Sequence, residues 1–485
     1  MSIVNALNNA ISGLTAAARG TEVVASNLAN ALTPGYGRRE LELSSRTLSG
    51  NGGGVHINAV NRIVSDAVLG EFRLASSGLA RSSVSHGFYK SIEAAIGLPQ
   101  DSGSLSVKMT GLENALISAA SRPDSEVRLR GVFDAADQLT AKLRSISDTI
   151  QDNRTDADRK IGLQVNALNN DLSEVARLNK QIIVEGANGR STASLVDARQ
   201  AVIDRISSIV PVREMPRENG RVALFTTGGA VLLDSMTPTT FGFQPTGRLV
   251  PDIDGNSAVL GRLTIDGEPA SSAQMDLLRG GSLSELHKVR DEYGVTAQAS
   301  LDAIARELHD RFADATVDGT LPSGVSGLFT DGLNNFDPAN ERGLSSRLRV
   351  NSAVDPSQGG ALWRIRDGIQ ANVPGDIGSS NLIDGLADAM GAIRQYHSAN
   401  ATNTAGNLGN LVAGVLSDVS ATRLTFEANK SRDATLQSSL QSALFTDAVD
   451  SDREMEMLLQ LEKSYAANAK VIQAVDKMLD NILRI

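Results

Sequence analysis

The sequence predicts an α+β fold, mainly α, in which a discontinuous helical stalk is built from both chain ends and a β-rich domain is inserted in the middle. At both ends, apolar residues recur in alternating steps of four and three, the spacing of coiled-coil helices. From about residue 211 the apolar residues follow a period of two, which is typical of strands. Because helical ends enclose a strand-rich middle, nesting is favoured over a simple series of α+β domains.

The composition of the 485-residue chain restricts its possible functions. Aromatic residues make up only 4% of it, so the cores must be built from Ala, Leu, Val and Ile, which suits packed helices. A net charge of -10 disfavours nucleic acid and anionic membranes as partners. The absence of cysteine excludes disulfides, thiolate metal sites and a Cys nucleophile.

The N-terminus lacks the features of a targeting segment. Its first residues, MSIVNALNNAISGL, have neither a charged leading region nor a continuous apolar stretch, so no cleaved signal peptide is expected. The longest apolar runs fall short of the roughly 18 residues that a membrane-spanning helix needs, so no membrane insertion is expected.

The two chain ends are candidate subunit interfaces. The N-terminal stripe ends before Thr33-Pro34-Gly35-Tyr36-Gly37, where proline and glycine redirect the chain. Its members are Leu7, Ile11, Leu14, Ala18, Thr21, Ala25 and Leu28. The C-terminal stripe consists of Leu458, Leu461, Tyr465, Asn468, Ile472, Val475, Leu479 and Ile482. Isolated helices of this kind are marginal in water, so they must pair with one another or with neighbouring copies, and the pattern suits both.

The next elements follow from their own periodicities. Heptads over residues 132–150 and 161–182, with no proline between Pro123 and Pro211, predict one very long helix or two stacked helices split near 151–162. A flexible loop is expected at 49–54, followed by a short alternating segment at 55–59.

Several short elements are expected after Pro211. Strands are predicted at 210–212, 222–224, 231–233 and 348–350, and at Leu362 and Ile365, with turns at Asn219-Gly220, Asp254-Gly255 and Asp266-Gly267. Helices are predicted over 301–312 and again from about Asn381, where apolar residues mark a stripe over 412–426.

These elements divide the chain into three expected domains. Residues 1–33 and 450–485 form a terminal coiled-coil-like axial domain. Residues 34–210 and 376–449 form a helical stalk, on which a helix near 280–315 is a candidate to pack. Residues 211–375 form a β-rich outer domain.

Catalytic chemistry is not indicated, and we expect no catalytic, cofactor-binding or metal-binding residues. The five histidines lack metal-ligand spacing, and no phosphate loop or nucleophile elbow is present. The segment Glu307-Leu308-His309-Asp310 is interpreted as the solvated face of a helix, and Trp363 as a core or interface anchor. Acidic pairs such as Glu454 with Glu456 are interpreted as exposed helix residues.

Short motifs at both ends resemble a known group of proteins. Residues 10–14 (AISGL), 26–30 (SNLAN), 33–36 (TPGY) and 465–472 (YAANAKVI) are similar to the signatures of flagellar rod, hook and hook-associated axial proteins. Leu28 departs mildly from that signature, because it stands where the group often has an Asn-Ile pair.

Motifs in the middle narrow the resemblance to the family of first hook-associated proteins. Residues 447–452 (DAVDSD) depart from that family's usual step before the last helix. The similar segments are 97–99 (GLP), 104–105 (SL), Pro123 with Arg128 and Arg130, 178–182 (LNKQI), 195–200 (LVDARQ), 279–283 (RGGSL), 290–291 (RD) and 362–368 (LWRIRDG).

The resemblance implies a structural subunit at the junction of hook and filament, outside the cell, exported by the flagellar type III system. Its implied partners are further copies of itself in a tubular layer, the hook protein and a second junction protein leading to flagellin. A cytoplasmic export chaperone is implied on the C-terminal helix. The alternatives are another axial subunit, of hook or distal rod, and a flagellum-associated cell-wall hydrolase.

Overall fold

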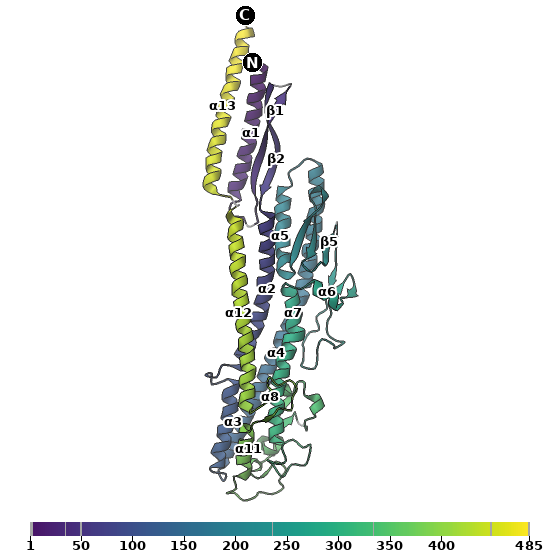
Figure 1. Cartoon of the computed structure of the whole chain (residues 1–485), viewed down its shortest axis with the longest axis vertical. Helices are drawn as coiled ribbons and strands as arrows, with labels where there is room; N and C mark the ends of the chain where they lie inside the picture. The colour runs from purple at the N-terminus through teal and green to yellow at the C-terminus, as the bar shows by residue number, and fades with distance from the viewer. Residues whose placement is uncertain are drawn as a thin grey trace.

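The computed structural model describes residues 3–33, 35–48, 51–234, 236–332, 334–446 and 449–483. The molecule is a long rod with both chain ends at its thin end and a broader body at the other (Figure 1). Long helices dominate, and small sheets lie mainly in the middle of the chain. This architecture confirms the predicted fold class. The division into three domains stays a prediction.

The thin end consists of two helices and a hairpin. Helix α1 (Ile3–Ala29) lies beside α13 (Ser451–Leu483), and β1 (Arg38–Leu48) pairs antiparallel with β2 (Asn51–Ile63). Asn51 to Gly54 belong to β2, so the expected loop at 49–54 is wrong for these residues. Residues 49 and 50 of that loop, Pro34 of TPGY, and Asp447 and Ala448 lie outside the described residues.

The stalk is a bundle of long helices around α4, which runs without interruption from Glu126 to Ala187. The alternative of a single very long helix is therefore confirmed. The other stalk helices are α2 (Asp66–Ile96), α3 (Leu105–Ala120), α5 (Ala193–Ile209), α8 (Gly294–Phe312), α11 (Asn381–Gly391) and α12 (Leu408–Thr446). The strand expected at 210–212 is wrong for its first two residues, because Val210 caps the end of α5 and β3 begins only at Val212.

Polar residues in the middle of α4 are buried and partnered, which explains why the helix continues there. Arg154 donates to the backbone carbonyls of Arg290, at 2.8 Å, and Ile253, at 2.5 Å. Asp158 pairs with the Arg290 guanidinium at 2.7 Å. Burial lowers the pKa of Arg154 to about 10. Gln151, Arg154 and Asp158 of the polar run thus belong to an internal network, whereas Asp152, Asp156, Arg159 and Lys160 are exposed.

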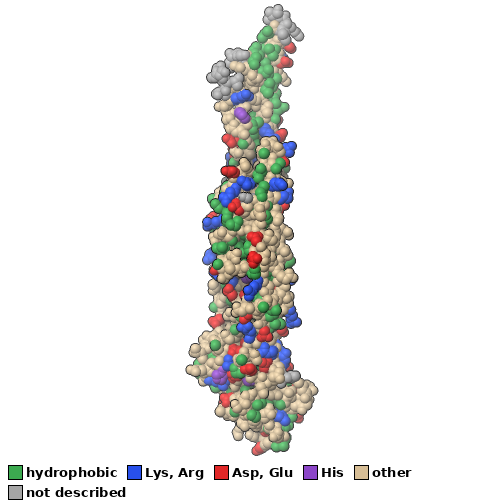
Figure 2. Space-filling model, turned by 90° about the vertical axis from the view of Figure 1, so that its right-hand side faces the viewer, with side chains coloured by type: hydrophobic (Ala, Val, Ile, Leu, Met, Phe, Trp, Pro, Cys, Tyr) green, Lys and Arg blue, Asp and Glu red, His purple; other side chains and the backbone are tan. Residues whose placement is uncertain are grey.

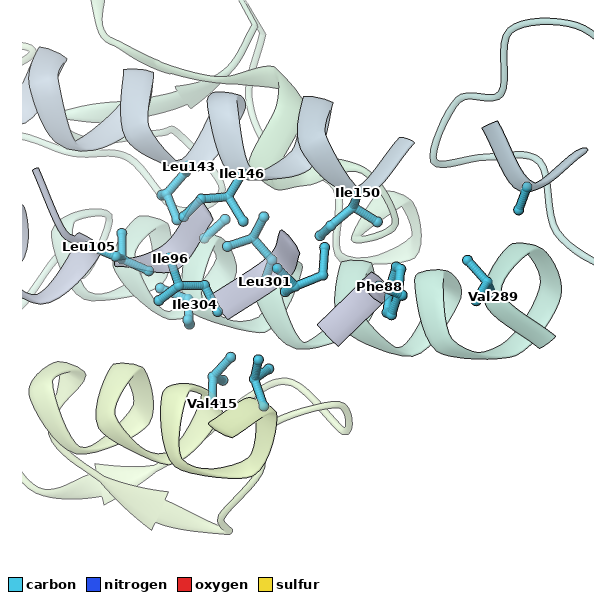
Figure 3. Packing of buried hydrophobic residues seen from close by; sticks show 14 of the residues in the cluster. Phe88, Ile96, Leu105, Leu143, Ile146, Ile150, Val289, Leu301, Ile304 and Val415 are labelled. Atoms are coloured by element: carbon cyan, nitrogen blue, oxygen red, sulfur yellow. The ribbon is translucent and has the colours of Figure 1, made fainter. Parts of the chain in front are cut away.

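Apolar side chains from several helices fill the stalk. Figure 3 shows Ile96 of α2 and Leu105 of α3 near Leu143 and Ile146 of α4. Val415 contributes from α12, which lies along α2 in Figure 1. Since these side chains are small aliphatics, the helices can approach closely, as the low aromatic content predicted.

The middle of the chain adds a four-stranded sheet beside the stalk, in the order β3-β4-β5-β6. Its strands are β3 (Val212–Pro216), β4 (Val222–Thr226), β5 (Val231–Asp234) and β6 (Thr237–Pro238). Asn219 and Gly220 both have positive φ, 59° and 72°, between β3 and β4. That conformation is the hairpin turn for which Asn-Gly is favoured, so this prediction is confirmed.

Shorter elements complete the body. Leu362 and Ile365 do not form the expected strand, because Ile365 lies in the short helix α10 and Leu362 just precedes it. The remaining strands are β7 (Phe241–Gly242), β8 (Thr264–Ile265), β9 (Glu268–Pro269), β10 (Phe329–Asp331), β11 (Leu348–Val350), β12 (Arg394–Gln395) and β13 (Ala405–Gly406). The remaining α-helices are α6 (Ser272–Leu277), α7 (Ser282–Lys288), α9 (Leu344–Arg347) and α10 (Arg364–Asp367).

Candidate subunit interface

Helices α1 and α13 pair antiparallel along a seam with a regular register. Gly13 meets Asn468 and Gly20 meets Leu461. One heptad further on, the Asn27 amide donates to Glu454 at 3.1 Å. Each contact lies seven residues from the next on both helices, so the pair has coiled-coil geometry.

Two glycines bring the helices of this seam close together. A Cβ atom on Gly13 would lie 2.7 Å from Asn468 Nδ2, and one on Gly20 would lie 2.9 Å from Leu461 Cδ2. Real side-chain carbons rarely come so near, so Asn468 and Leu461 fit because the glycines leave room.

The opposite side of α1 is partly covered by the hairpin. Ser12 accepts a hydrogen bond from the backbone N–H of Val55 in β2, at 3.1 Å. The residues of α1 that become buried are mostly small, as this close packing requires: Ala10, Ala16, Ala17, Gly20, Val23, Val24 and Asn27. Helix α1 is therefore held between α13 and β2.

The predicted N-terminal stripe lies on the part of α1 that neither neighbour buries. Ile11 is 48% exposed and Leu28 is 37% exposed. Ala18, Thr21 and Ala25 are also exposed, while Leu7 and Leu14 are half-buried. This stripe therefore does not form a buried seam with α13, because most of its members face outward and Leu7 and Leu14 are only partly covered.

The predicted C-terminal stripe, in contrast, partly faces α1. Val475 is buried. The half-buried members are Leu458, Leu461, Asn468 and Ile472, and the exposed ones are Tyr465, Leu479 and Ile482. The structure thus brings this stripe onto the small-residue side of α1. That side was missed, although Gly13, Gly20 and Asn27 recur at heptad spacing in the sequence.

Charge is scarce on α1. Its 27 residues include only Arg19 and Glu22 as charged side chains, and these two pair with each other. Figure 2 shows hydrophobic side chains gathered along the thin end of the molecule. A helix with a solvated outer face usually carries many more charges, whereas the centres of protein interfaces are depleted of them.

The polar side chains of the segment 307–310 and the Trp363 ring contact neighbouring protein side chains. The expectation that Glu307 and His309 face solvent is wrong, because both are buried. His309 contacts Asp310 at 2.9 Å, and the Asp310 carboxylate also contacts His397 at 2.9 Å. Burial raises the pKa of Asp310, whereas the hydrogen bonds to His309 and His397 lower it. The pKa of Asp310 is lowered overall. Trp363 is half-buried beneath the Arg364 guanidinium.

The described part of the chain contains neither a metal-binding cluster nor a membrane-spanning helix. Over these residues, no group of three His, Cys, Asp or Glu side chains is placed to hold a metal ion. Within the same ranges, none of the helices is both long and apolar enough to cross a membrane.

Three family models match this chain, and all describe flagellar proteins. Residues 7–36 match the flagella basal body rod protein, and residues 440–485 match the C-terminal part of the flagellar basal body rod FlgEFG proteins. Residues 90–328 match the helical domain of the flagellar hook-associated protein FlgK. The paired ends and this helical body define a structural component of the flagellum.

Full-length comparisons specify the family. Flagellar hook-associated protein 1 of Bacillus subtilis (strain 168) is 22% identical, covering 98% of this chain and 97% of the relative. The protein of the same name from Escherichia coli (strain K12) is 21% identical, covering 99% of each. The chain belongs to the flagellar hook-associated protein 1 family. A solved structure of the flagellar hook junction protein FlgK from Burkholderia pseudomallei is 18% identical with a TM-score of 0.45, covering 54% of this chain and 47% of that one.

Proposed function

We propose that this protein is a non-enzymatic subunit of the junction between the flagellar hook and filament. The observation that carries the proposal is the outward stripe of α1, an apolar surface on a helix with a single ion pair. Such a surface is incomplete in the monomer, and a neighbouring copy can cover it. The full-length similarity to hook-associated proteins supports the same conclusion.

The interface in this proposal comprises both predicted stripes. Copies associate through the outward stripe of α1 and through the exposed parts of α13, including Tyr465, Leu479 and Ile482. The resulting tubular layer contacts the hook protein on one side and a second junction protein leading to flagellin on the other. The helices thereby form an axial domain of residues 1–33 and 450–485, while residues 211–375 lie outside.

The proposal extends to export and location. In this proposal the chain leaves the cell through the flagellar type III system, without a cleaved signal peptide, and functions extracellularly. A chaperone covers the C-terminal helix in the cytoplasm. Covering is physically useful because Leu459, Met478 and Ile482 are each more than half exposed on α13 and would favour aggregation.

The proposal is tested by placing charge on the outward stripe. The double variant Ile11→Asp/Leu28→Asp is expected to fold but to fail to restore swimming in a motile bacterium lacking its own hook-associated protein 1. Desolvating two carboxylates in a packed interface costs several kcal/mol without a partner. The matched control is Leu163→Asp on α4, where a similarly exposed leucine lies outside the stripe.

Swimming speed and immunolabelling of the hook tip report the outcome. Normal swimming of the double variant would refute the interface. Deletion of residues 458–485 gives a second test, with a soluble body that cannot join the hook as the expected result. Labelling along the hook or distal rod would instead favour another axial subunit, and peptidoglycan cleavage in a zymogram would favour a hydrolase.

A further inference from the structure

A partly buried polar network lies where the thin end meets the stalk, and Asn27 is its first centre. The Asn27 side chain is almost fully buried. Its Oδ1 accepts from the backbone N–H of Arg39 and from the Tyr36 hydroxyl, both at 3.0 Å. Its Nδ2 donates to the Arg39 carbonyl at 2.8 Å and to Glu454 at 3.1 Å. An asparagine amide can make four hydrogen bonds, and this one makes all four.

The second centre is Asp197 on α5. Its carboxylate accepts from Arg62 Nε at 2.7 Å, from Arg39 Nη2 at 3.3 Å and from the backbone N–H of Gly37 at 3.2 Å. The side chains of Asp197, Arg39 and Arg62 are each less than one-fifth exposed. These bonds are charge-assisted and partly shielded from water, which makes them stronger than ordinary surface ion pairs.

Arg39 joins the two centres. Its backbone is bound by Asn27 and its side chain by Asp197. A continuous path therefore runs from Glu454 at the start of α13, through α1 and the hairpin, to α5 in the stalk. The long helices α12 and α13 are separate elements that end and begin at this same level.

We propose that Asn27 and Asp197 are positioning residues whose network, the joint clasp, fixes the direction of the terminal helices relative to the stalk. A subunit of a tube must present its axial helices at one angle to its outer body. The clasp supplies this constraint by joining α1 and the hairpin that follows it to two distant segments, α5 through Asp197 and α13 through Glu454. Its role in assembly rests on the proposed function, whereas its effect on the angle does not.

The absence of cysteine allows a direct measurement. Spin labels on Ala25→Cys in α1 and Ser208→Cys in α5 report the distance across the joint in the purified full-length chain. A second pair, Lys160→Cys with Ser208→Cys, lies within the stalk. Because no hook is present, failure of assembly cannot alter either distance distribution.

Asp197→Ala is expected to broaden the distribution across the joint at least twofold and to leave the stalk pair unchanged, while Asp197→Glu restores part of the narrow distribution. Asp171→Ala is the matched control, because Asp171 is as shielded as Asp197 but pairs at 2.6 Å with Arg205 inside the stalk.

Asn27→Leu, which leaves α5 intact, is expected to broaden the same distribution as Asp197→Ala. The clasp is overturned if Asn27→Leu matches the parent in width. It is also overturned if Asp171→Ala broadens the joint as much as Asp197→Ala does.

Discussion

The thin end and the stalk use the same heptad pattern with different results. In the stalk, the heptad face of α4 is buried, and Leu139, Leu143 and Leu168 have no exposed surface. In the thin end, the pattern of α1 leaves Ile11 and Leu28 substantially exposed. The difference is the number of neighbours, since among the described residues α1 packs mainly on α13 and on the β1–β2 hairpin. A heptad thus predicts that a face will be buried, but not which molecule buries it.

The largest expected difference between the two regions is in their local opening. In the purified monomer, backbone amides of α13 should exchange hydrogen on the order of a thousandfold faster than those of α4, because few buried contacts hold α13. Hydrogen exchange followed by mass spectrometry measures this ratio. Equal protection would show that the terminal pair is already complete in the monomer, which would contradict the interface. Protection of α13 should rise on assembly.

Replacing leucine by alanine should give a smaller difference between the two regions, measured as the loss of unfolding free energy. Leu143→Ala removes a fully buried side chain and should lower the free energy of unfolding by about 3 kcal/mol. Leu461→Ala removes a half-buried one and should cost about 1 kcal/mol. Urea denaturation followed by circular dichroism gives both values. The exposed Leu163→Ala is the control, expected within about 0.5 kcal/mol of the parent.

The smallest effect is expected at the glycine seam. Gly20→Ala should change the stability of the terminal pair by less than about 0.5 kcal/mol, because the crowded atoms are the movable methyl groups of Leu461. Alanine also favours helix by about 1 kcal/mol over glycine, which offsets the crowding. Thermal unfolding of the variant measures the change. A loss above about 2 kcal/mol would mean that the seam is rigid and cannot adapt.

The sequence predicted the fold class better than the contacts of the interface. Heptad periodicity predicted helix over the α4 region, as one helix or two, and the Asn219-Gly220 pair predicted the hairpin turn, because both features depend on local rules. Periodicity could not show that Arg154 and Asp158 would be buried, since their partners lie about a hundred residues away. Leu362 and Ile365 were read as strand because a short apolar spacing does not distinguish a strand from a helical turn.

The interface shows the same limit. In the sequence, the outward stripe of α1 stands out because Leu7, Ile11, Leu14 and Leu28 recur along it. The side that packs on α13 is lined by Gly13 and Gly20, and glycine contributes nothing to a hydrophobic pattern. Asn27 belongs to a quoted motif, yet one of its four hydrogen bonds joins it to Glu454, 427 residues away in the sequence, while the other three go to Tyr36 and Arg39.

The uninterrupted course of α4 restricts how the chain can change in length. Its 62 residues extend about 93 Å, so its length sets the length of most of the body. One inserted residue would rotate everything beyond it by about 100° and put the two halves of the buried face out of phase. Seven inserted residues nearly restore the phase and add about 10 Å. Members of the family that differ in length are therefore expected to differ in surface loops, or by whole heptads in this helix.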